Sequence, residues 1–348
     1  MNAHLASRCS EPEPTRLRIP EAAWTRLRSH LGQPGVTQQV WDASFAYGVS
    51  CDELAELIDY WRDELELPAR LLELPCFDAH AAGQHLRFVS ARSARPAALP
   101  LLLLHGYSGS LFELGALAPA LNDAGYDVVS PALPGFGSAE ASATAFAEAC
   151  AELMRGLGYE RYAVHGSDLG ASLALELAAV DGAHVAALHV SHVPAYPGRD
   201  PMEVASLTAE EKSRLARLSE LHELLHFHLP ESPVEELAFA VSRLDDADLA
   251  SPRLREDLLT SLTFTCAFGS SSGRAALYRA SGLTPASPSS VPTAVEERPL
   301  GAPSLRRFAE RQRRIVEWRE HDSGGPAPGF EDPEGLLQAL TRFGERLR

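Results

Sequence analysis

The pattern of apolar and polar residues changes along the chain. Residues 16–73 carry apolar side chains at helical spacing, as at Ala23, Trp24 and Leu27, and we expect helices there. Further on, short and continuously apolar runs alternate with helical stretches. The expected strands are residues 86–89, 99–105, 127–130, 162–166 and 186–190, and the expected helices between them are 111–124, 144–157 and 170–180. This alternation predicts an α/β fold with a mostly parallel sheet flanked by helices.

Residues 196–285 interrupt this alternation with charged, Leu-, Glu- and Arg-rich helical sequence. The α/β pattern then resumes, with expected strands at 292–295 and 314–318 and expected helices at 304–313 and from 333 onwards. An insertion near the carboxyl edge of a sheet suits a lid over an active site. The predicted organisation is an N-terminal helical segment (1–95), a first half of the core (96–195), a lid (196–285) and a second half of the core (286–348).

Composition narrows the classes of function. The chain has 348 residues, and its 47 acidic against 31 basic residues give a formal net charge of −16. Such a charge repels nucleic acids and acidic membrane surfaces, so we expect neither as a partner. Five scattered cysteines, no recognisable signal peptide and no long apolar run favour a cytoplasmic protein. We expect a small hydrophobic molecule as its partner and no cofactor or metal, and we leave a homodimer open.

The most informative motif lies at residues 164–171, Val-His-Gly-Ser-Asp-Leu-Gly-Ala. A strand runs through small residues to Asp168, and small residues then open a helix. This arrangement is typical of a nucleophile elbow, with Asp168 at its centre. The helix N-terminus would keep the carboxylate ionised. The alternative is that Asp168 only caps the helix that begins at Leu169.

Two further loops follow neighbouring strands. Residues 105–110 read His-Gly-Tyr-Ser-Gly-Ser, a loop of the kind that supplies backbone N–H groups to an oxyanion hole. Residues 130–138 read Ser-Pro-Ala-Leu-Pro-Gly-Phe-Gly-Ser after the next strand. Upstream stand a Tyr-Trp pair at 60–61 and Leu-Pro-Cys-Phe at 74–77, and Val-Pro-Thr at 291–293 follows the insertion.

Together these motifs resemble the epoxide hydrolase family of the microsomal type. The resemblance covers nearly the whole chain and is weakest over residues 196–285. It implies an α/β-hydrolase fold with an N-terminal epoxide hydrolase domain. It also implies a two-step reaction, in which an aspartate attacks the epoxide while two lid tyrosines protonate its oxygen. A histidine oriented by an acid then activates water to hydrolyse the ester.

The resemblance assigns roles to four residues of this chain. Asp168 matches the nucleophile, and Tyr278 matches the second lid tyrosine. The backbone amides of Tyr107 and Leu169 match the oxyanion donors. We therefore expect these four residues to meet at one site.

Other family positions are changed. Pro326 stands at the position of the histidine and Gly301 at that of its acid, and no tyrosine between Tyr196 and Tyr278 matches the first lid tyrosine. Losing a positioned base costs about 10²–10⁴ in rate. We therefore predict a non-hydrolytic outcome, such as ring opening, cyclisation or isomerisation of a hydrophobic natural-product epoxide. A hydrolase with a relocated base and an inactive binding protein remain the alternatives.

Several residues are candidates for a relocated base or acid. His321 lies near the end of the last strand and His192 at the end of the strand beside the elbow, and the alternative for each is a surface or packing role. Glu296 and Glu297 are candidate acids, but we expect them to be exposed. The remaining candidates are the histidines of the insertion.

Residues 222–226 read His-Glu-Leu-Leu-His, a zinc-type pattern on a predicted helix. His228 would be a third ligand, but it falls on another helix face. A chance match in a helix rich in Leu, Glu and His explains the pattern without metal. A third interpretation is that His222 or His226 faces Asp168 in place of the missing tyrosine.

Overall fold

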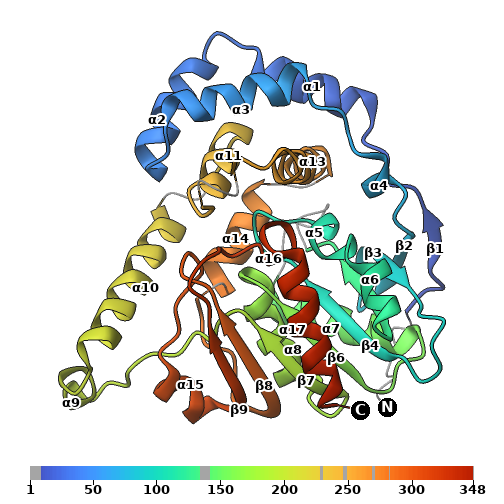
Figure 1. Ribbon diagram of the computed structural model, residues 1–348, viewed down its shortest axis with the longest axis vertical. Coiled ribbons are helices and arrows are strands. Elements are labelled where there is room, and N and C mark those ends of the chain that lie inside the picture. The colour runs from blue at the N-terminus through green and yellow to red at the C-terminus, as the bar shows by residue number, and fades with distance from the viewer. Residues whose placement is uncertain are drawn as a thin grey trace, which may run out of the picture.

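The computed structural model describes residues 9–133, 142–227, 230–245, 249–268, 271–281 and 283–347. Its centre is a nine-stranded sheet with the order β1-β2-β3-β5-β4-β6-β7-β8-β9 (Figure 1). The pairs from β1 to β3, and the pair β3–β5, are antiparallel, and every pair from β5 through β4 to β9 is parallel. The prediction of a mostly parallel sheet is confirmed. The strands are β1 Glu13–Thr15, β2 Cys76–Ala81, β3 Gln84–Ala91, β4 Leu99–Leu104, β5 Tyr126–Pro131, β6 Tyr162–Gly166, β7 Val185–Val190, β8 Ser289–Glu297 and β9 Arg313–Glu320.

The helices fall into three groups along the chain. Those before and within the first half of the sheet are α1 Glu21–Leu31, α2 Val36–Tyr47, α3 Cys51–Asp63, α4 Ala69–Leu72, α5 Leu111–Gly115, α6 Ala118–Asp123, α7 Ala143–Gly156 and α8 Leu169–Val180. Those between β7 and β8, the inserted helices, are α9 Pro201–Ala205, α10 Ala209–Phe227, α11 Pro233–Val241, α13 Pro252–Phe268 and α14 Ser271–Ser281. The last are α15 Arg306–Gln312, α16 Pro328–Glu331 and α17 Pro333–Glu345.

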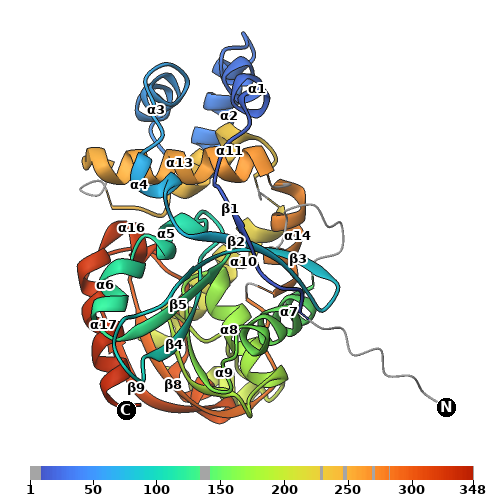
Figure 2. The ribbon, with the colours of Figure 1, turned by 90° about the vertical axis from the view of Figure 1, so that its right-hand side faces the viewer.

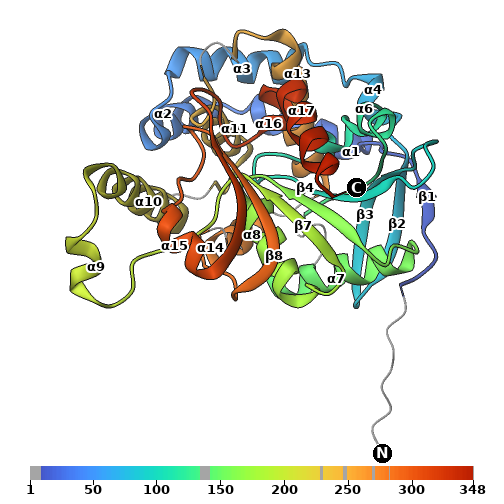
Figure 3. The same ribbon diagram turned by 60° about the horizontal axis from the view of Figure 1, so that its bottom comes forward.

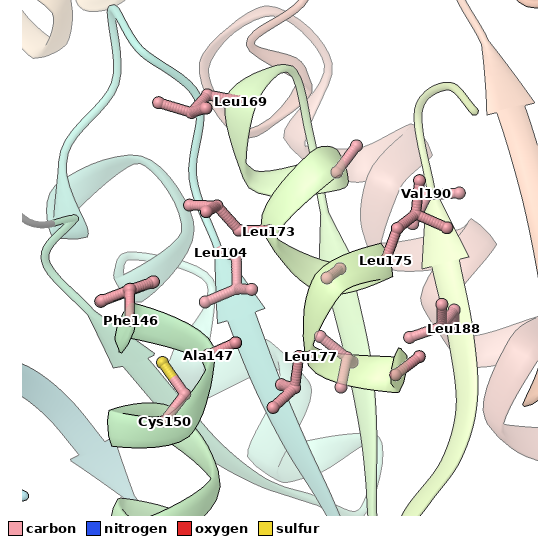
Figure 4. Packing of buried hydrophobic residues seen from close by; sticks show 14 of the residues in the cluster. Leu104, Phe146, Ala147, Cys150, Leu169, Leu173, Leu175, Leu177, Leu188 and Val190 are labelled. Carbon is pink, nitrogen blue, oxygen red and sulfur yellow. The ribbon is translucent and has the colours of Figure 1, made fainter. Parts of the chain in front are cut away.

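Both faces of the sheet are covered by helices. On one face α7 and α8 pack their apolar side chains on β4 and β7, as Phe146, Leu173 and Leu188 show in Figure 4. On the other face α6 and α17 cover β4 and β5 through a second apolar cluster. The central parallel strands β4, β6 and β7 are therefore buried on both faces, which explains why their sequences are mostly apolar.

The N-terminal helices pack mainly on the inserted helices. One apolar cluster joins α1, α2 and α3 to α11 and α13, and Figure 2 shows this layer above the sheet. The indole Nε1 of Trp61 donates a hydrogen bond of 2.7 Å to Thr263 Oγ1 and ties α3 to α13. By contrast, α10 lies along the outside of the molecule (Figures 1 and 3).

The sequence pattern misplaced two features. Residues 76–81 form β2, which pairs with β3 across a turn at Ala82 and Gly83, although the first strand that we expected began at residue 86. Its mixed polar and apolar residues follow from its place in the antiparallel margin of the sheet, where burial is partial. The single helix expected over 111–124 is two helices, α5 and α6.

No helix in the described parts of the chain combines the length and the apolar character that crossing a bilayer requires.

Candidate active site

Asp168 occupies the sharp connection between β6 and α8. Its φ of 50° and ψ of −124° lie in a region that side chains rarely adopt, at a cost of about 1–3 kcal/mol. The small neighbours are required: a Cβ on Gly166 would lie 2.3 Å from the Gly170 carbonyl oxygen, and one on Gly170 would lie 2.0 Å from that of Leu104. Although Asp168 holds the N-cap position, its side chain makes no capping hydrogen bond. The geometry is that of an elbow, and the capping interpretation is wrong.

Three groups donate hydrogen bonds to the Asp168 carboxylate. The backbone N–H of Tyr107 donates to Oδ2 at 2.9 Å. Arg243 Nη2 donates to Oδ1 at 2.8 Å, and the Tyr278 hydroxyl donates to the same oxygen. Arg243 Nη1 also donates to the Tyr278 hydroxyl oxygen at 3.2 Å, which closes a three-residue cluster. Asp168, Arg243 and Tyr278 are 3%, 7% and 1% exposed.

The charges of this cluster fix the ionisation of Asp168. Burial opposes ionisation, but the positive charge of Arg243 and the hydrogen bonds from Tyr278 and Tyr107 outweigh it, so the pKa of Asp168 lies below its usual value. Burial raises the pKa of Tyr278 far above its usual value, and the nearby Arg243 acts against this rise. The resting site therefore holds a carboxylate and a neutral phenol in direct contact.

A second buried ion pair contacts the loop at residues 105–110. Arg274 on α14 pairs with Glu236 on α11, with 2.6 Å between Nη2 and Oε1. Arg274 Nη1 also donates to the carbonyl oxygen of Tyr107 at 3.2 Å. The Tyr107 ring stacks on the Tyr278 ring, with 5.2 Å between centroids, and meets Phe239 edge-on. The inserted helices thus hold both tyrosines against the elbow.

Leu169 and His192 lie beside the elbow. Leu169 is fully buried at the start of α8, and the role of its amide as an oxyanion donor stays a prediction. The backbone N–H of Asp168 donates to Ser191 Oγ at 3.0 Å, and this hydroxyl lies 3.3 Å from His192 Nδ1. His192 is therefore buried one side chain away from the elbow backbone, and its catalytic role also stays a prediction.

His321 belongs to a different group, at the carboxyl end of β8. Its Nε2 lies 3.4 Å from Glu296 Oε2, and Glu296 also pairs with His189 on β7 and with Arg342 on α17. The expectation that Glu296 and Glu297 are exposed is wrong, because they are 8% and 5% exposed. They are buried because β8 runs between β7 and β9 and bears α17 on one side.

His222 and His226 lie on the exposed face of α10, where their rings stack with 4.2 Å between centroids. The expectation that one of them faces Asp168 is therefore wrong. The reason is the position of α10, whose buried residues Leu218 and Leu225 face the molecule instead. His228 falls outside the described residues. Within the described ranges no three His, Cys, Asp or Glu side chains gather closely enough to hold a metal.

The loop after β9 is where the resemblance would place a catalytic histidine. Pro326 is buried there, in a loop shaped by Glu331, which accepts hydrogen bonds from the backbone N–H groups of Gly325 and Ala327. A Cβ on Gly325 would lie 2.2 Å from the carbonyl oxygen of Arg243, so the loop packs closely against the arginine's backbone.

Two residues near the site were missed by the sequence analysis. Arg243 follows the apolar helix α11 in a segment rich in charge, where one arginine does not stand out. Glu113 stands three residues after Ser110, a spacing that normally signals helix capping.

Comparisons with known proteins agree with this architecture. Residues 12–114 match the family model described as epoxide hydrolase N terminus, and residues 100–221 match that of the alpha/beta hydrolase fold. A putative epoxide hydrolase of Stigmatella aurantiaca is 26% identical over 378 residues, which cover 96% of this chain and 85% of that protein. Epoxide hydrolase 1 of Sus scrofa is 27% identical over 187 residues, covering 47% of this chain and 41% of its own.

Solved structures share the fold over nearly the full length. The epoxide hydrolase of Aspergillus niger superposes with a TM-score of 0.76 at 21% identity and covers 98% of both chains. The juvenile hormone epoxide hydrolase of the silkworm Bombyx mori gives a TM-score of 0.75 at 19% identity, over 97% of this chain and 95% of that one. At these identities the superpositions establish the fold alone.

Proposed function

We infer that this chain is an epoxide-hydrolase-like enzyme that rearranges its substrate without adding water. Its sequence matches an epoxide hydrolase N-terminal domain followed by an α/β-hydrolase domain. The substrate is a hydrophobic epoxide that carries its own nucleophile, such as a hydroxyl group, as natural-product intermediates often do. The observation that carries this proposal is the direct hydrogen bond between the Tyr278 hydroxyl and Asp168 Oδ1, with Arg243 bonded to both.

This contact supplies a base and an acid that can restore each other. Asp168 takes the proton of the substrate hydroxyl while the hydroxyl oxygen attacks an epoxide carbon. The carbon–oxygen bond of the epoxide breaks, and the released oxygen takes the proton of Tyr278. When the product leaves, the resting hydrogen bond between Asp168 and Tyr278 forms again, and the proton on Asp168 passes along it to the Tyr278 phenolate. The product is an isomer of the substrate, and no water is consumed.

In this reaction Arg243 donates a hydrogen bond to the epoxide oxygen, the role that the resemblance gives to the first lid tyrosine. The substrate enters between Asp168 Oδ1 and the two donors, so the epoxide oxygen receives the hydrogen bonds that the carboxylate holds at rest. A fixed positive charge stabilises the alkoxide as it forms, and a buried site strengthens this effect. It also favours the phenolate that Tyr278 becomes for a moment.

The loop at Pro326 supports a non-hydrolytic outcome. Proline has no group that accepts a proton, so any ester on Asp168 lacks the base that relatives are expected to use there. Asp168 acting as a base avoids the ester altogether. Asp168 acting as a nucleophile would leave an alkylated protein, which intact mass spectrometry detects.

The experiment compares two substrates, a simple aryl epoxide and an epoxide with a hydroxyl group placed to form a five- or six-membered cyclic ether. We expect the second to give a product of unchanged mass. Tyr278→Phe should lower this rate by about 10²–10⁴-fold, because the acid is lost while the ring remains. A diol as the main product, or a Tyr278→Phe variant with the wild-type rate, would refute the proposal.

The buried Asp168–Arg243 pair also favours a second candidate, a binding protein without catalysis. An arginine on the reactive oxygen lowers its reactivity, and the pair completes its own hydrogen bonding. In that case Asp168→Asn would leave ligand affinity and biological activity unchanged, and no epoxide in a broad panel would be converted.

A further inference from the structure

Glu113 is a buried carboxylic acid that lies beside the site, and the proposed rearrangement does not use it. It lies on α5, is 1% exposed, and neither of its oxygens has a hydrogen-bond partner. Buried polar atoms are nearly always paired, and an unpaired carboxyl group in the interior is costly. A group retained at this cost next to a reactive carboxylate is a candidate for chemistry.

Two glycines leave room for this carboxyl group. A Cβ on Gly109 would lie 2.0 Å from Glu113 Oε2, and a Cβ on Gly329 would lie 2.8 Å from Glu113 Cγ. Glu113 therefore lies between the turn at residues 106–109 and the loop that contains Pro326. The resemblance places the catalytic histidine of relatives on that loop.

The same turn separates Glu113 from Asp168. The N–H of Gly109 donates to the carbonyl oxygen of Gly106 at 3.2 Å, which closes the turn, so its ends lie less than about 7 Å apart. At the other end, a Cβ on Gly106 would lie 3.0 Å from Asp168 Oδ2. Both carboxyl groups thus flank one four-residue turn, and each lies beside a glycine at one end of it.

The groups that face Glu113 hold it near the point of ionisation. Burial raises its pKa to about 8, and the negative charges of Glu331 on α16 and Asp168 at the elbow act in the same direction. The backbone amides of Gly329 and Gly106 lie near enough to oppose the rise, but they form no hydrogen bond of normal geometry with Glu113 and do not cancel it. Glu113 is therefore mostly protonated at neutral pH and becomes a base as the pH approaches its pKa.

We propose that Glu113 is the general base of a second, slower activity, the hydrolysis of the ester that forms when Asp168 attacks an epoxide. This inference rests on the proposed function only in taking Asp168 as the group that meets the epoxide. Water attacks the carbonyl carbon of the ester and gives its proton to Glu113. The bond from that carbon to the alkyl oxygen breaks, and this oxygen takes the proton from Glu113. Tyr278 gives its proton to the epoxide oxygen when the ring opens, and the Asp168 acid released by hydrolysis gives a proton back to the Tyr278 phenolate. Epoxide and water thus become a diol, and Asp168, Tyr278 and Glu113 return to their starting states.

The test follows styrene oxide with wild type and Glu113→Gln between about pH 6 and about pH 9, measuring diol release and the intact mass of the protein. Wild type should release diol slowly, at a rate that rises with pH up to about 8. Glu113→Gln should release it about 10²–10⁴-fold more slowly and accumulate an adduct on Asp168. Asp181→Asn, a change at a buried carboxyl group at the end of α8 opposite to Asp168, where it accepts a hydrogen bond from Tyr162, should keep the wild-type profile.

Two results would overturn the inference. One is a Glu113→Gln variant with the wild-type rate and pH profile. The other is a wild type that forms neither adduct nor diol at any pH. The hydroxyl-bearing epoxide separates this inference from the proposed function, because its rearrangement does not use Glu113. Loss of diol with the rearrangement intact supports the base role, whereas diol without rearrangement contradicts the proposed function and leaves the base role standing.

Thermal unfolding provides a check that is independent of activity. In the unfolded chain Glu113 ionises near its ordinary pKa, whereas in the folded protein it stays protonated up to about pH 8. Wild-type stability should therefore fall as the pH rises through this interval and level off above it. Glu113→Gln should remove this fall in stability. The stability of the variant relative to that of the wild type should therefore increase between about pH 5 and about pH 9. A difference in stability between the two proteins that does not change with pH would contradict the conclusion that Glu113 is buried without a hydrogen-bond partner and close to negative charges.

Discussion

The two sides of the Asp168 carboxylate differ in their chemistry. On one side Tyr107, Tyr278 and Arg243 donate hydrogen bonds to it, and their positions are fixed by aromatic packing and a second buried ion pair. Beyond the turn at residues 106–109 lie the unpaired Glu113, on α5, and the loop that contains Pro326. In the proposed reaction the donor side supplies the acid and the positive charge that ring opening needs. The loop side holds a proline at the position where the resemblance places a water-activating histidine.

Asp168→Asn removes the carboxylate that the three donors contact, and it should have the largest effect on activity. The amide cannot accept a proton, so rearrangement of the hydroxyl-bearing epoxide should fall by about 10⁴-fold, the upper end for loss of a general base. Product formation measured by mass spectrometry checks this. If rearrangement persisted at a tenth of the wild-type rate, Asp168 would not be the reactive group.

Arg243→Met tests whether the donor side is an electrostatic unit. Removing one member of a buried pair leaves the other charge without a partner, and we expect a loss of about 3–5 kcal/mol in the free energy of unfolding. The double variant with Asp168→Asn should lose less than the sum of the two single variants, since no charge is then stranded. Urea unfolding of the four proteins measures this cycle. Simple additivity would show that the pair is not coupled.

Glu296→Gln changes a buried carboxyl group away from the site. It shows how much a buried ion pair contributes to stability where no reaction is proposed. Burial opposes ionisation of Glu296, but His189 and His321 outweigh it and lower its pKa to about 2. Its contribution to stability is therefore present above the ordinary pKa and lost as the pH falls towards 2. We expect a loss of about 1–3 kcal/mol at neutral pH that shrinks in acid. Glu310→Gln, in an exposed pair with Arg306, is the control and should change stability little at either pH.

His222→Ala should have the smallest effect. The side chain is exposed on α10 and stacks only on His226. We expect a change within about 0.5 kcal/mol in the free energy of unfolding and an unchanged rate. A large loss of activity would return the inserted histidines to the mechanism.

The sequence predicted the parts of this molecule that depend on local pattern. The apolar runs around β4, β6 and β7 identified buried parallel strands, and the small residues around Asp168 identified the elbow, because both follow from steric rules over a few residues. The strand β2 was missed, because its alternation is weak and its pairing with β1 is non-local.

The sequence could not predict the long-range electrostatics of the site. Arg243 reaches Asp168 from 75 positions away, and Glu113 is enclosed between the nearby turn at residues 106–109 and the distant Gly329 on α16. Glu296 and Glu297 were expected to be exposed for the same reason, since their burial depends on neighbours contributed by other parts of the chain. Such contacts are set by tertiary packing, which no local pattern records.

The most direct measurement is the isotope content of the product formed from a hydroxyl-bearing epoxide in heavy-oxygen water. If Asp168 and Tyr278 only exchange protons with the substrate and with each other, no water enters the product. The account therefore predicts a cyclic ether with the mass of the substrate and no heavy oxygen. A diol that carries heavy oxygen, released at a rate comparable with that of other epoxide hydrolases, would contradict it.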